Sequence, residues 1–425
     1  MVAIGVLLAA CVPAALAAPV PAASVQTLHW WTSASERRAA NLLGARLAEE
    51  GVEWKDGAIP GGAGVGAGKV LKSRVLAGDA PEAMQLIGAS IGEWANAGLL
   101  LEIDQVAQAD NWRGVLFPAI SQLVQHRQHV FAVPLGIHRI NSLFYNQKLF
   151  RKYNLAPPTT WPELQQAARV LLAADVTPLA QSSEPWQVAG LFENLVLAEG
   201  GPEYYRALFV AQTAQATADR RLTQALERLR IMKGWAGKPV RERAWTDMVR
   251  QVANGEAAMV VMGDWAKGEL NEWGLQAGVE FGCIAMPGTH NFHLYSVDTL
   301  AMFASDYSHM PAQEKLASIA LRPLVQAEYN RLKGSVPVRR DADTGRMDSC
   351  ARASWRTFAE GAAQQAPSLT HRMATDEESR EAIIAEIYRY FMDDRITPAQ
   401  TQKRLDMIFR GFRLRKQDNE GSSSA

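Results

Sequence analysis

The sequence predicts an α/β fold, because short apolar runs alternate with helix-patterned segments over most of the 425 residues. A chain of this length is sufficient for two domains of ordinary size. Hydrophobic residues make up 48% and charged residues 21%, a balance that is typical of a globular rather than a disordered chain. Lys+Arg and Asp+Glu both total 44, so no basic excess indicates a nucleic acid or an anionic membrane as partner.

The first half of the chain supplies clear strand and helix patterns in turn. Residues 25–31, "VQTLHWW", predict a first strand, and residues 35–51 then place apolar side chains at helical spacing. Ser35 is the candidate N-cap of that helix. Residues 80–88 predict the end of another strand, and residues 129–146 predict two strands with a polar interruption. The order favours strands that are joined by helices.

The second half continues the alternation. Residues 157–174 predict a helix that Thr160 and Glu163 open as a capping box. Residues 255–270, "GEAAMVVMGDWAKGEL", predict a buried strand that breaks into a polar turn. Residues 381–412 predict two helices, of which the second begins at a Thr-Pro pair and ends near a glycine.

The two ends of the chain differ from the rest in composition. Residues 1–24 predict a secretory signal peptide, because the apolar run is too short to span a bilayer. The stretch "LAAC" also resembles a lipoprotein box, and a lipid anchor at Cys11 is the alternative to soluble export. The polar residues 413–425 predict a flexible tail.

Removing the leader leaves two cysteines, Cys283 and Cys350. An even pair in an exported chain favours a disulfide, and two buried thiols are the alternative. A disulfide across a loop of this length stabilises by roughly 4 kcal/mol in the chain-entropy model.

Common catalytic and cofactor motifs fail in detail. The glycine-rich stretch "GGAGVGAGKV" lacks the phosphate-loop spacing, since Ala63 stands where the first glycine is needed and Val70 where a Ser or Thr is needed. The eight histidines form no metal-ligand pattern, and no Gly-x-Ser-x-Gly elbow occurs. We therefore expect no cofactor and no metal.

Polar and aromatic residues stand instead at the ends of the predicted strands. At the carboxyl ends of α/β strands such side chains would converge on a crevice of the kind that binds ligands. Indole faces suit the apolar C–H faces of sugars as well as core packing. The residues are Trp30, Trp31, Glu36, His138, Asp264, Trp265, Asp298, Lys333 and His371.

Several of these stretches belong to a longer colinear pattern. The chain resembles the sugar-binding proteins of bacterial ABC importers, and most closely their glucose-binding members, over roughly residues 26–412. The matching stretches are "LHWWTSASE", "EWKDGAIPGGAG", "VLKSRVLAG", "AVPLGIHRIN", "PPTTWPEL", "VMGDWAKGE", "CIAMPGT", "KGSVPVR", "MDSC" and "HRMAT".

The resemblance implies a two-lobed periplasmic-binding-protein-like fold of class II, with the ligand in a cleft between the lobes. One lobe would hold residues 25–143 with 290–336, and the other residues 148–286 with 340–412. The protein would be a periplasmic monomer. Its closed form would dock onto the permease subunits at the inner membrane and deliver a monosaccharide or a small oligosaccharide.

The resemblance also gives each residue a role toward the sugar. Trp31 and Trp265 would sandwich the ring, and Trp30 would line the wall. Glu36 and Asp298 would accept hydrogen bonds from hydroxyl groups. The remaining substrate-binding residues are Gln85, Ile87, Asp264, and the donors or orienting groups Lys333, His138 and His371.

One position departs from the glucose-binding pattern. Ile87 stands where the family places a lysine. Loss of an ammonium–hydroxyl bond costs about 1.5–3 kcal/mol, so the sugar preference is expected to have moved from glucose. Two other functions share these features: a sugar sensor that presents its ligand to a chemoreceptor or sensor kinase, and a glycoside hydrolase that uses Glu36 and Asp298.

Overall fold

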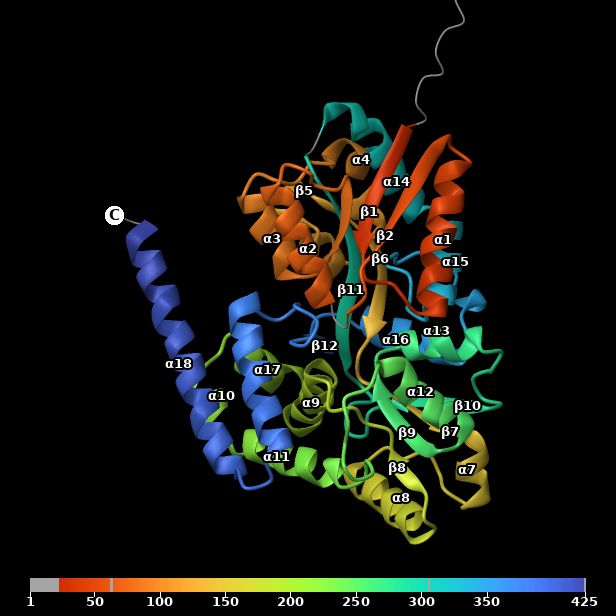
Figure 1. Cartoon of the computed structure of the whole chain (residues 1–425), viewed down its shortest axis with the longest axis vertical. Helices are drawn as coiled ribbons and strands as arrows, with labels where there is room; N and C mark the ends of the chain where they lie inside the picture. Colours follow the sequence, from red (N-terminus) through yellow and green to blue (C-terminus); the bar gives the residue numbers. More distant parts are fainter. Residues whose placement is uncertain (1–22, 62–63, 305, 424–425) are drawn as a thin grey trace, which may run out of the picture.

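The computed structural model describes residues 23–61, 64–304 and 306–423. Two lobes lie one above the other, each with its own sheet and its own hydrophobic core (Figure 1). The predicted signal peptide and Cys11 lie outside the described residues. No helix in the described part of the chain is both long and apolar enough to cross a bilayer.

The first lobe is built on a six-stranded sheet in the order β12-β11-β3-β1-β2, with β6 paired to β11. β1 lies parallel to β2 and β3, whereas β11 runs antiparallel to β3 and β6. The mixed sheet confirms the α/β prediction. The strands are β1 (Ala23–His29), β2 (Val52–Ala58), β3 (Ala83–Leu86), β6 (Ala132–Arg139), β11 (His293–Met302) and β12 (Gln365–Pro367).

The helices of the first lobe cover this sheet, and a short hairpin lies beside them. The helices are α1 (Ala34–Ala48), α2 (Val65–Leu76), α3 (Ala89–Asn96), α4 (Asp104–Ala109), α5 (Trp112–Val115), α6 (Pro118–Leu123), α14 (Met310–Leu321), α15 (Pro323–Lys333) and α16 (Ser349–Ala359). The hairpin pairs β4 (Gln125–His126) with β5 (His129–Val130), and 3₁₀ turns span Tyr307–His309 and Thr344–Arg346. α1 begins two residues earlier than predicted, because Ser33 and not Ser35 caps it, in a capping box with Glu36.

The second lobe has a four-stranded sheet in the order β10-β7-β9-β8. Its strands are β7 (Ser142–Asn146), β8 (Thr177–Leu179), β9 (Ala257–Met262) and β10 (Phe281–Ala285). Its helices are α7 (Gln147–Lys152), α8 (Trp161–Ala173), α9 (Pro185–Phe209), α10 (Ala214–Ala218), α11 (Arg220–Lys233), α12 (Trp245–Asn254), α13 (Trp265–Glu272), α17 (Glu377–Met392) and α18 (Pro398–Ser423). The capping box that Thr160 and Glu163 predict is confirmed at the start of α8.

The last helix extends into the predicted flexible tail, of which the structure describes residues 413–423. α18 continues through Gly411 as far as Ser423 and reaches beyond the body of the lobe (Figure 1). A single glycine inside a helix costs only about 1 kcal/mol relative to alanine. Strong helix formers follow it, and an ion pair between Arg415 and Glu378 joins the helix to α17.

α16 belongs to the first lobe, contrary to the expected assignment of residues 340–412 to the second. Its residues Ala351 and Phe358 are part of the core of the first lobe. Phe358 packs edge-on against Phe117, with ring centroids 5.2 Å apart. The chain therefore returns to the second lobe only after α16 and β12, the strand that pairs with β11.

The predicted disulfide between Cys283 and Cys350 is present, with the two Cα atoms 6.0 Å apart. Cys283 lies on β10 and packs against the core of the second lobe. Cys350 lies on α16, which packs on the first lobe. The disulfide thus joins the two lobes covalently.

Candidate functional site

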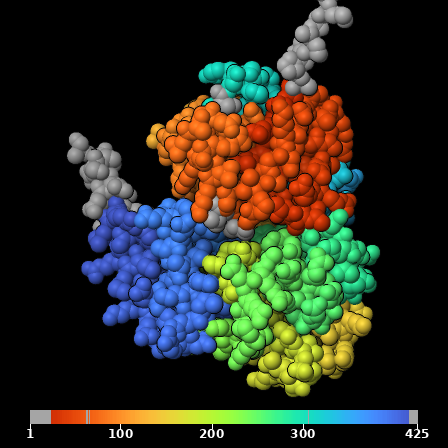
Figure 2. Space-filling view, in the orientation of Figure 1, coloured from red at the N-terminus to blue at the C-terminus, as the bar shows by residue number. Residues whose placement is uncertain are grey.

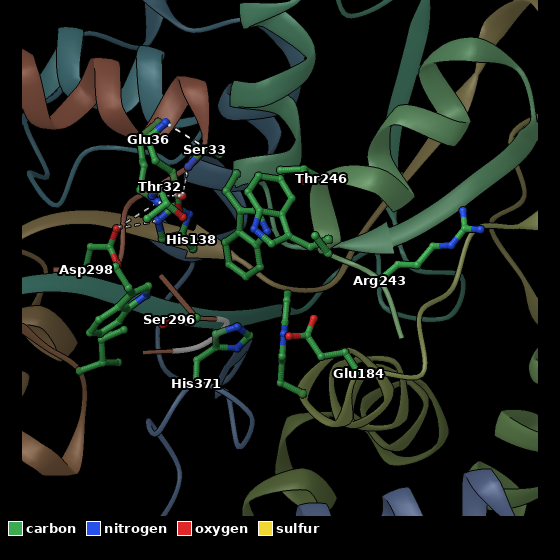
Figure 3. Close-up of a pocket in the computed structure, with 18 of the residues that line it drawn as sticks. Thr32, Ser33, Glu36, His138, Glu184, Arg243, Thr246, Ser296, Asp298 and His371 are labelled. Carbon is green, nitrogen blue, oxygen red and sulfur yellow. Dashed lines mark hydrogen bonds and ion pairs between the residues drawn. The ribbon is translucent and has the colours of Figure 1, made fainter. Parts of the chain in front are cut away.

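A pocket of about 490 Å³ lies where the two lobes meet. The surface of the first lobe borders that of the second along a line across the molecule (Figure 2), and the close-up shows side chains from both sides (Figure 3). From the first lobe come Trp30, Thr32, Ser33, Glu36, Gly61, Ile87, Ser296, Asp298 and Lys333. His138 and His371 also line the pocket, and the second lobe contributes Glu184, Trp186, Glu242, Arg243, Ala244, Trp245, Thr246 and Trp265.

Indoles from both lobes line this pocket. Trp30 follows β1 on the first lobe, whereas Trp186, Trp245 and Trp265 stand at the amino-terminal ends of α9, α12 and α13. The rings of Trp186 and Trp265 have centroids 6.4 Å apart. Large apolar faces from both lobes therefore line one opening.

The tandem tryptophans point in different directions. Trp31 is fully buried in the core of the first lobe, where it stacks on His29 at 4.8 Å and meets Tyr329 edge-on. Its backbone N–H donates to His29 Nδ1 at 3.2 Å, while that of Trp30 donates to Gln85 Oε1 at the same distance. The expected stacking of Trp31 on a sugar is therefore wrong, and Trp30 alone of this pair lines the pocket.

A chain of ionic contacts forms the inner end of the pocket. Lys333 Nζ lies 2.9 Å from Glu36 Oε1 and 3.6 Å from Asp298 Oδ2. His138 follows, with Nε2 3.2 Å from Asp298 Oδ2 and Nδ1 2.5 Å from Asp264 Oδ1. The side chains of these five residues are at least nine-tenths buried, so their contacts are shielded from solvent.

These contacts fix the charges of the groups. Burial alone would lower the pKa of His138, but Asp264 and Asp298 outweigh it and raise that pKa to about 9. Burial works against ionisation of Asp298 as well, yet Lys333 and His138 hold the pKa of its carboxyl below the ordinary value. The pKa of Lys333 is raised by Glu36 and Asp298 in spite of burial. The inner end thus carries alternating fixed charges.

Two of the expected binding residues lie behind the pocket wall. Gln85 is fully buried and donates from Nε2 to Asp298 Oδ1 at 2.9 Å. Asp264 accepts from the backbone N–H of Arg139 at 2.9 Å in addition to its contact with His138. Neither side chain lines the pocket, so direct contact with a ligand, as expected from the sequence, is wrong for both. They hold Asp298 and His138 in place.

Ile87 and His371 face the pocket from neighbouring segments. Ile87 follows β3, and the next residue, Gly88, has φ +59°. A Cβ at Gly88 would collide with the carbonyl of Arg372, so only glycine lets the 371–373 segment approach β3 this closely. Because of this close approach, His371 and Ile87 line the same pocket.

Of the second lobe's pocket residues, the sequence indicated Trp265 but not those at the starts of α9 and α12. Glu184 and Trp186 lie at the start of α9, and Arg243 and Trp245 lie at the start of α12. The signal in the sequence was a lone tryptophan at each of these places, which is equally typical of core packing. A surface cluster of Glu102, Asp104 and His129 was also not expected from the sequence; in it, His129 Nδ1 and Asp104 Oδ2 are 2.6 Å apart.

The fold and this pocket together define a two-lobed protein that binds a solute between its lobes. The chain belongs to the bacterial extracellular solute-binding protein family, whose model matches residues 33–305. It is a binding component and not an enzyme. Membership of this family of binding proteins overturns the glycoside hydrolase alternative.

Known relatives agree with this placement. A probable sugar-binding periplasmic protein of Brucella suis is 34% identical over 346 residues, which cover 80% of this chain and 82% of the relative. A protein of the same description from Rhizobium meliloti is 32% identical over 372 residues, covering 87% and 90%. A solved chitin oligosaccharide binding protein shares the fold, with a TM-score of 0.77, 19% identity, and coverage of 92% and 98%.

Proposed function

We propose that this protein captures a neutral sugar, glucose or a related hexose or small oligosaccharide, between its lobes and delivers it to an ABC import permease. The observation that carries the proposal is the pocket itself, in which indoles from both lobes surround a buried chain of charged groups. The Brucella and Rhizobium relatives, both described as probable sugar-binding periplasmic proteins, support it.

The apolar side of the proposal rests on the tryptophans. A pyranose ring offers C–H faces that pack on an indole, and each such face contributes roughly 1–3 kcal/mol by area burial and stacking. Trp265 presents its ring from the second lobe, and Trp30 lines the opposite wall. With Trp31 in the core, Trp30 takes the place that we expected Trp31 to occupy.

The polar side rests on the buried charges. Glu36 and Asp298 are carboxylates with room for further acceptor contacts, and Lys333 is an ammonium donor at the same end of the pocket. Because these three already satisfy one another, they are fixed in place before a sugar arrives. Preorganised groups lose little conformational freedom on binding, which favours affinity.

The choice of sugar rests on Ile87. Its side chain lines the pocket and is nearly buried, and it offers no hydrogen bond. A lysine at this place would add an ammonium–hydroxyl bond of about 1.5–3 kcal/mol. We therefore propose that D-glucose binds roughly ten- to a hundred-fold more weakly than it would to a lysine-bearing pocket.

Isothermal titration calorimetry of the full chain against hexoses, pentoses and disaccharides tests the proposal. At least one neutral sugar is expected to bind, and Trp265→Ala is expected to weaken it at least ten-fold. Trp273→Ala is the matched control, because Trp273 ends the same helix outside the pocket and packs under Arg250. Absence of binding by every sugar, or equal loss in both variants, would refute the proposal.

A further inference from the structure

A fully buried glutamate lies behind the histidine of the pocket. Glu193 sits in the middle of α9 with no solvent exposure. Its Oε2 atom accepts from the hydroxyl of Tyr205 at 2.6 Å and from the backbone N–H groups of Leu369 at 2.8 Å and Thr370 at 3.4 Å. Its Oε1 atom accepts from the hydroxyl of Ser368 at 2.8 Å. Because Tyr205, Leu369 and Thr370 all donate to Oε2, Oε1 is the oxygen that accepts from Ser368.

The hydroxyl of Ser368 connects this glutamate to the pocket. Ser368 Oγ lies 2.9 Å from His371 Nδ1 and 3.2 Å from the backbone N–H of His371. A serine hydroxyl has one proton to donate and two lone pairs that accept. If that proton goes to Glu193, Ser368 can only accept from His371, and Nδ1 must then carry a proton.

The other ring nitrogen of His371 is then left with a lone pair. Burial, together with the positive charge of Arg380, lowers the pKa of His371 to about 3, so the ring is neutral at pH 7. His371 lines the pocket, whereas Ser368 does not, and the ring extends from its loop toward the centre of the pocket (Figure 3). Within the described ranges, Nε2 has no hydrogen-bond partner.

We propose that Glu193 and Ser368 lock His371 in the Nδ1–H tautomer, so that its Nε2 atom offers the pocket a hydrogen-bond acceptor. A ligand hydroxyl placed there must donate, which reverses the donor role expected from the sequence. The statement about the ligand rests on the proposed function, while the tautomer is a property of the free protein. Glu193 and Ser368 are positioning residues that contact no ligand.

Replacing Glu193 by glutamine should reverse the direction of the hydrogen bonds from residue 193 through Ser368 to His371. In Glu193→Gln, the amide oxygen must face Tyr205, Leu369 and Thr370, because all three donate to that place. The amide NH₂ then faces Ser368 and donates to it. Ser368 must turn its own proton to His371 Nδ1, which leaves the proton of the ring on Nε2.

Two-bond ¹H–¹⁵N correlation spectra of the ¹⁵N-histidine-labelled full chain at pH 7 test this without any ligand. The His371 signals are assigned from their loss in His371→Gln. We expect an unprotonated Nε2 in the native chain and a protonated Nε2 in Glu193→Gln. In Ser368→Ala, we expect the strong preference to be lost. A native Nε2–H tautomer, or a Glu193→Gln variant that keeps Nδ1–H, would overturn the proposal.

The matched control is Glu386→Gln. Glu386 is also a buried glutamate, on α17, but it pairs with Arg389 and Arg404 and lies outside the pocket. It is expected to leave the His371 tautomer unchanged, and a tautomer change in this variant would contradict the relay. Thermal unfolding shows which variants are folded. If a sugar panel finds no ligand, the proposed function fails while these spectra still decide the tautomer.

Discussion

Glu269 on α13 accepts two hydrogen bonds from Ser35 at the amino-terminal end of α1, one from the backbone N–H at 3.1 Å and one from the hydroxyl at 2.8 Å. α1 belongs to the first lobe and α13 to the second. A carboxylate from one lobe therefore caps a helix of the other, where the positive end of the helix dipole favours it. The contact lies one turn beyond Trp265, so the lobes are joined directly beside the pocket.

Glu269→Ala is expected to loosen this junction. Hydrogen bonds to a charged group contribute about 1.5–3 kcal/mol each, so the arrangement in which α13 lies against α1 should lose part of its advantage. Small-angle scattering should show a larger radius of gyration, and any sugar identified by calorimetry should bind more weakly. Glu280→Ala, on an exposed residue of the second lobe, is the control. Unchanged scattering in Glu269→Ala would contradict the role of this contact.

Lys333→Met is expected to be strongly destabilising. Lys333 is the cation between Glu36 and Asp298, and all three are buried. Removing one partner of a buried ion pair leaves an uncompensated charge and costs about 3–5 kcal/mol. Urea unfolding should show a loss of that size, whereas Lys315→Met on the surface should lose less than about 1 kcal/mol. Equal effects from the two variants would refute the account of the charge chain.

Stability is expected to fall between pH 6.5 and 9. The folded-state pKa of His138 is about 9, above its unfolded value of 6.5. Its contribution is therefore fully present below pH 6.5 and is lost as the pH rises through 9. The shift corresponds to about 3 kcal/mol. Urea unfolding of the native chain and of His138→Gln at several pH values isolates this contribution, and a parallel pH dependence of both would show that His138 is not charged.

Removal of the disulfide is expected to reduce stability and to free the lobes. The bond spans 67 residues of sequence, for which the chain-entropy model gives roughly 4 kcal/mol. Because it joins β10 to α16, its loss should also increase the separation of the lobes measured by scattering. The double variant Cys283→Ser/Cys350→Ser tests this, and dithiothreitol should affect the native chain but not the double variant. A double variant as stable as the oxidised native chain would contradict the expectation.

Ile87→Lys is expected to tighten the binding of D-glucose roughly ten- to a hundred-fold, which is the value of the missing ammonium–hydroxyl bond. Calorimetry with D-glucose measures it. Ile87→Met, a similar chain length without charge, is the control and should leave the affinity nearly unchanged. If both variants behave alike, Ile87 does not set the preference for glucose.

Much of the fold could be predicted because it depends on local patterns. Alternating apolar runs and the Thr160–Glu163 capping box are readable without tertiary structure. The position of α16 was not readable, since an amphipathic helix shows which face is buried but not which lobe buries it. The end of α18 was missed because one glycine is a weak stop signal compared with the helix formers around it.

The sequence predicted which residue types build the candidate site, but not which of them face the pocket and which face the core. Charged residues such as Glu36, Asp298 and Lys333 are costly to bury, and all three line one pocket. They lie in α1, in the middle of β11 and at the end of α15, and not at strand ends as the sequence led us to expect. Adjacent residues at a strand end face opposite ways, however, and the sequence does not show which of Trp30 and Trp31 faces the core. Trp186 and Trp245 come from helix starts that only the tertiary fold brings to the same opening.

The most direct test of the central claim is a crystal structure of the full chain with the sugar that binds most tightly in the calorimetric panel. We expect the sugar between the lobes, with one ring face on Trp265, the other side near Trp30, and hydroxyl groups on Glu36 and Asp298. A sugar bound outside this pocket, or one that contacts a single lobe and no indole, would contradict the account.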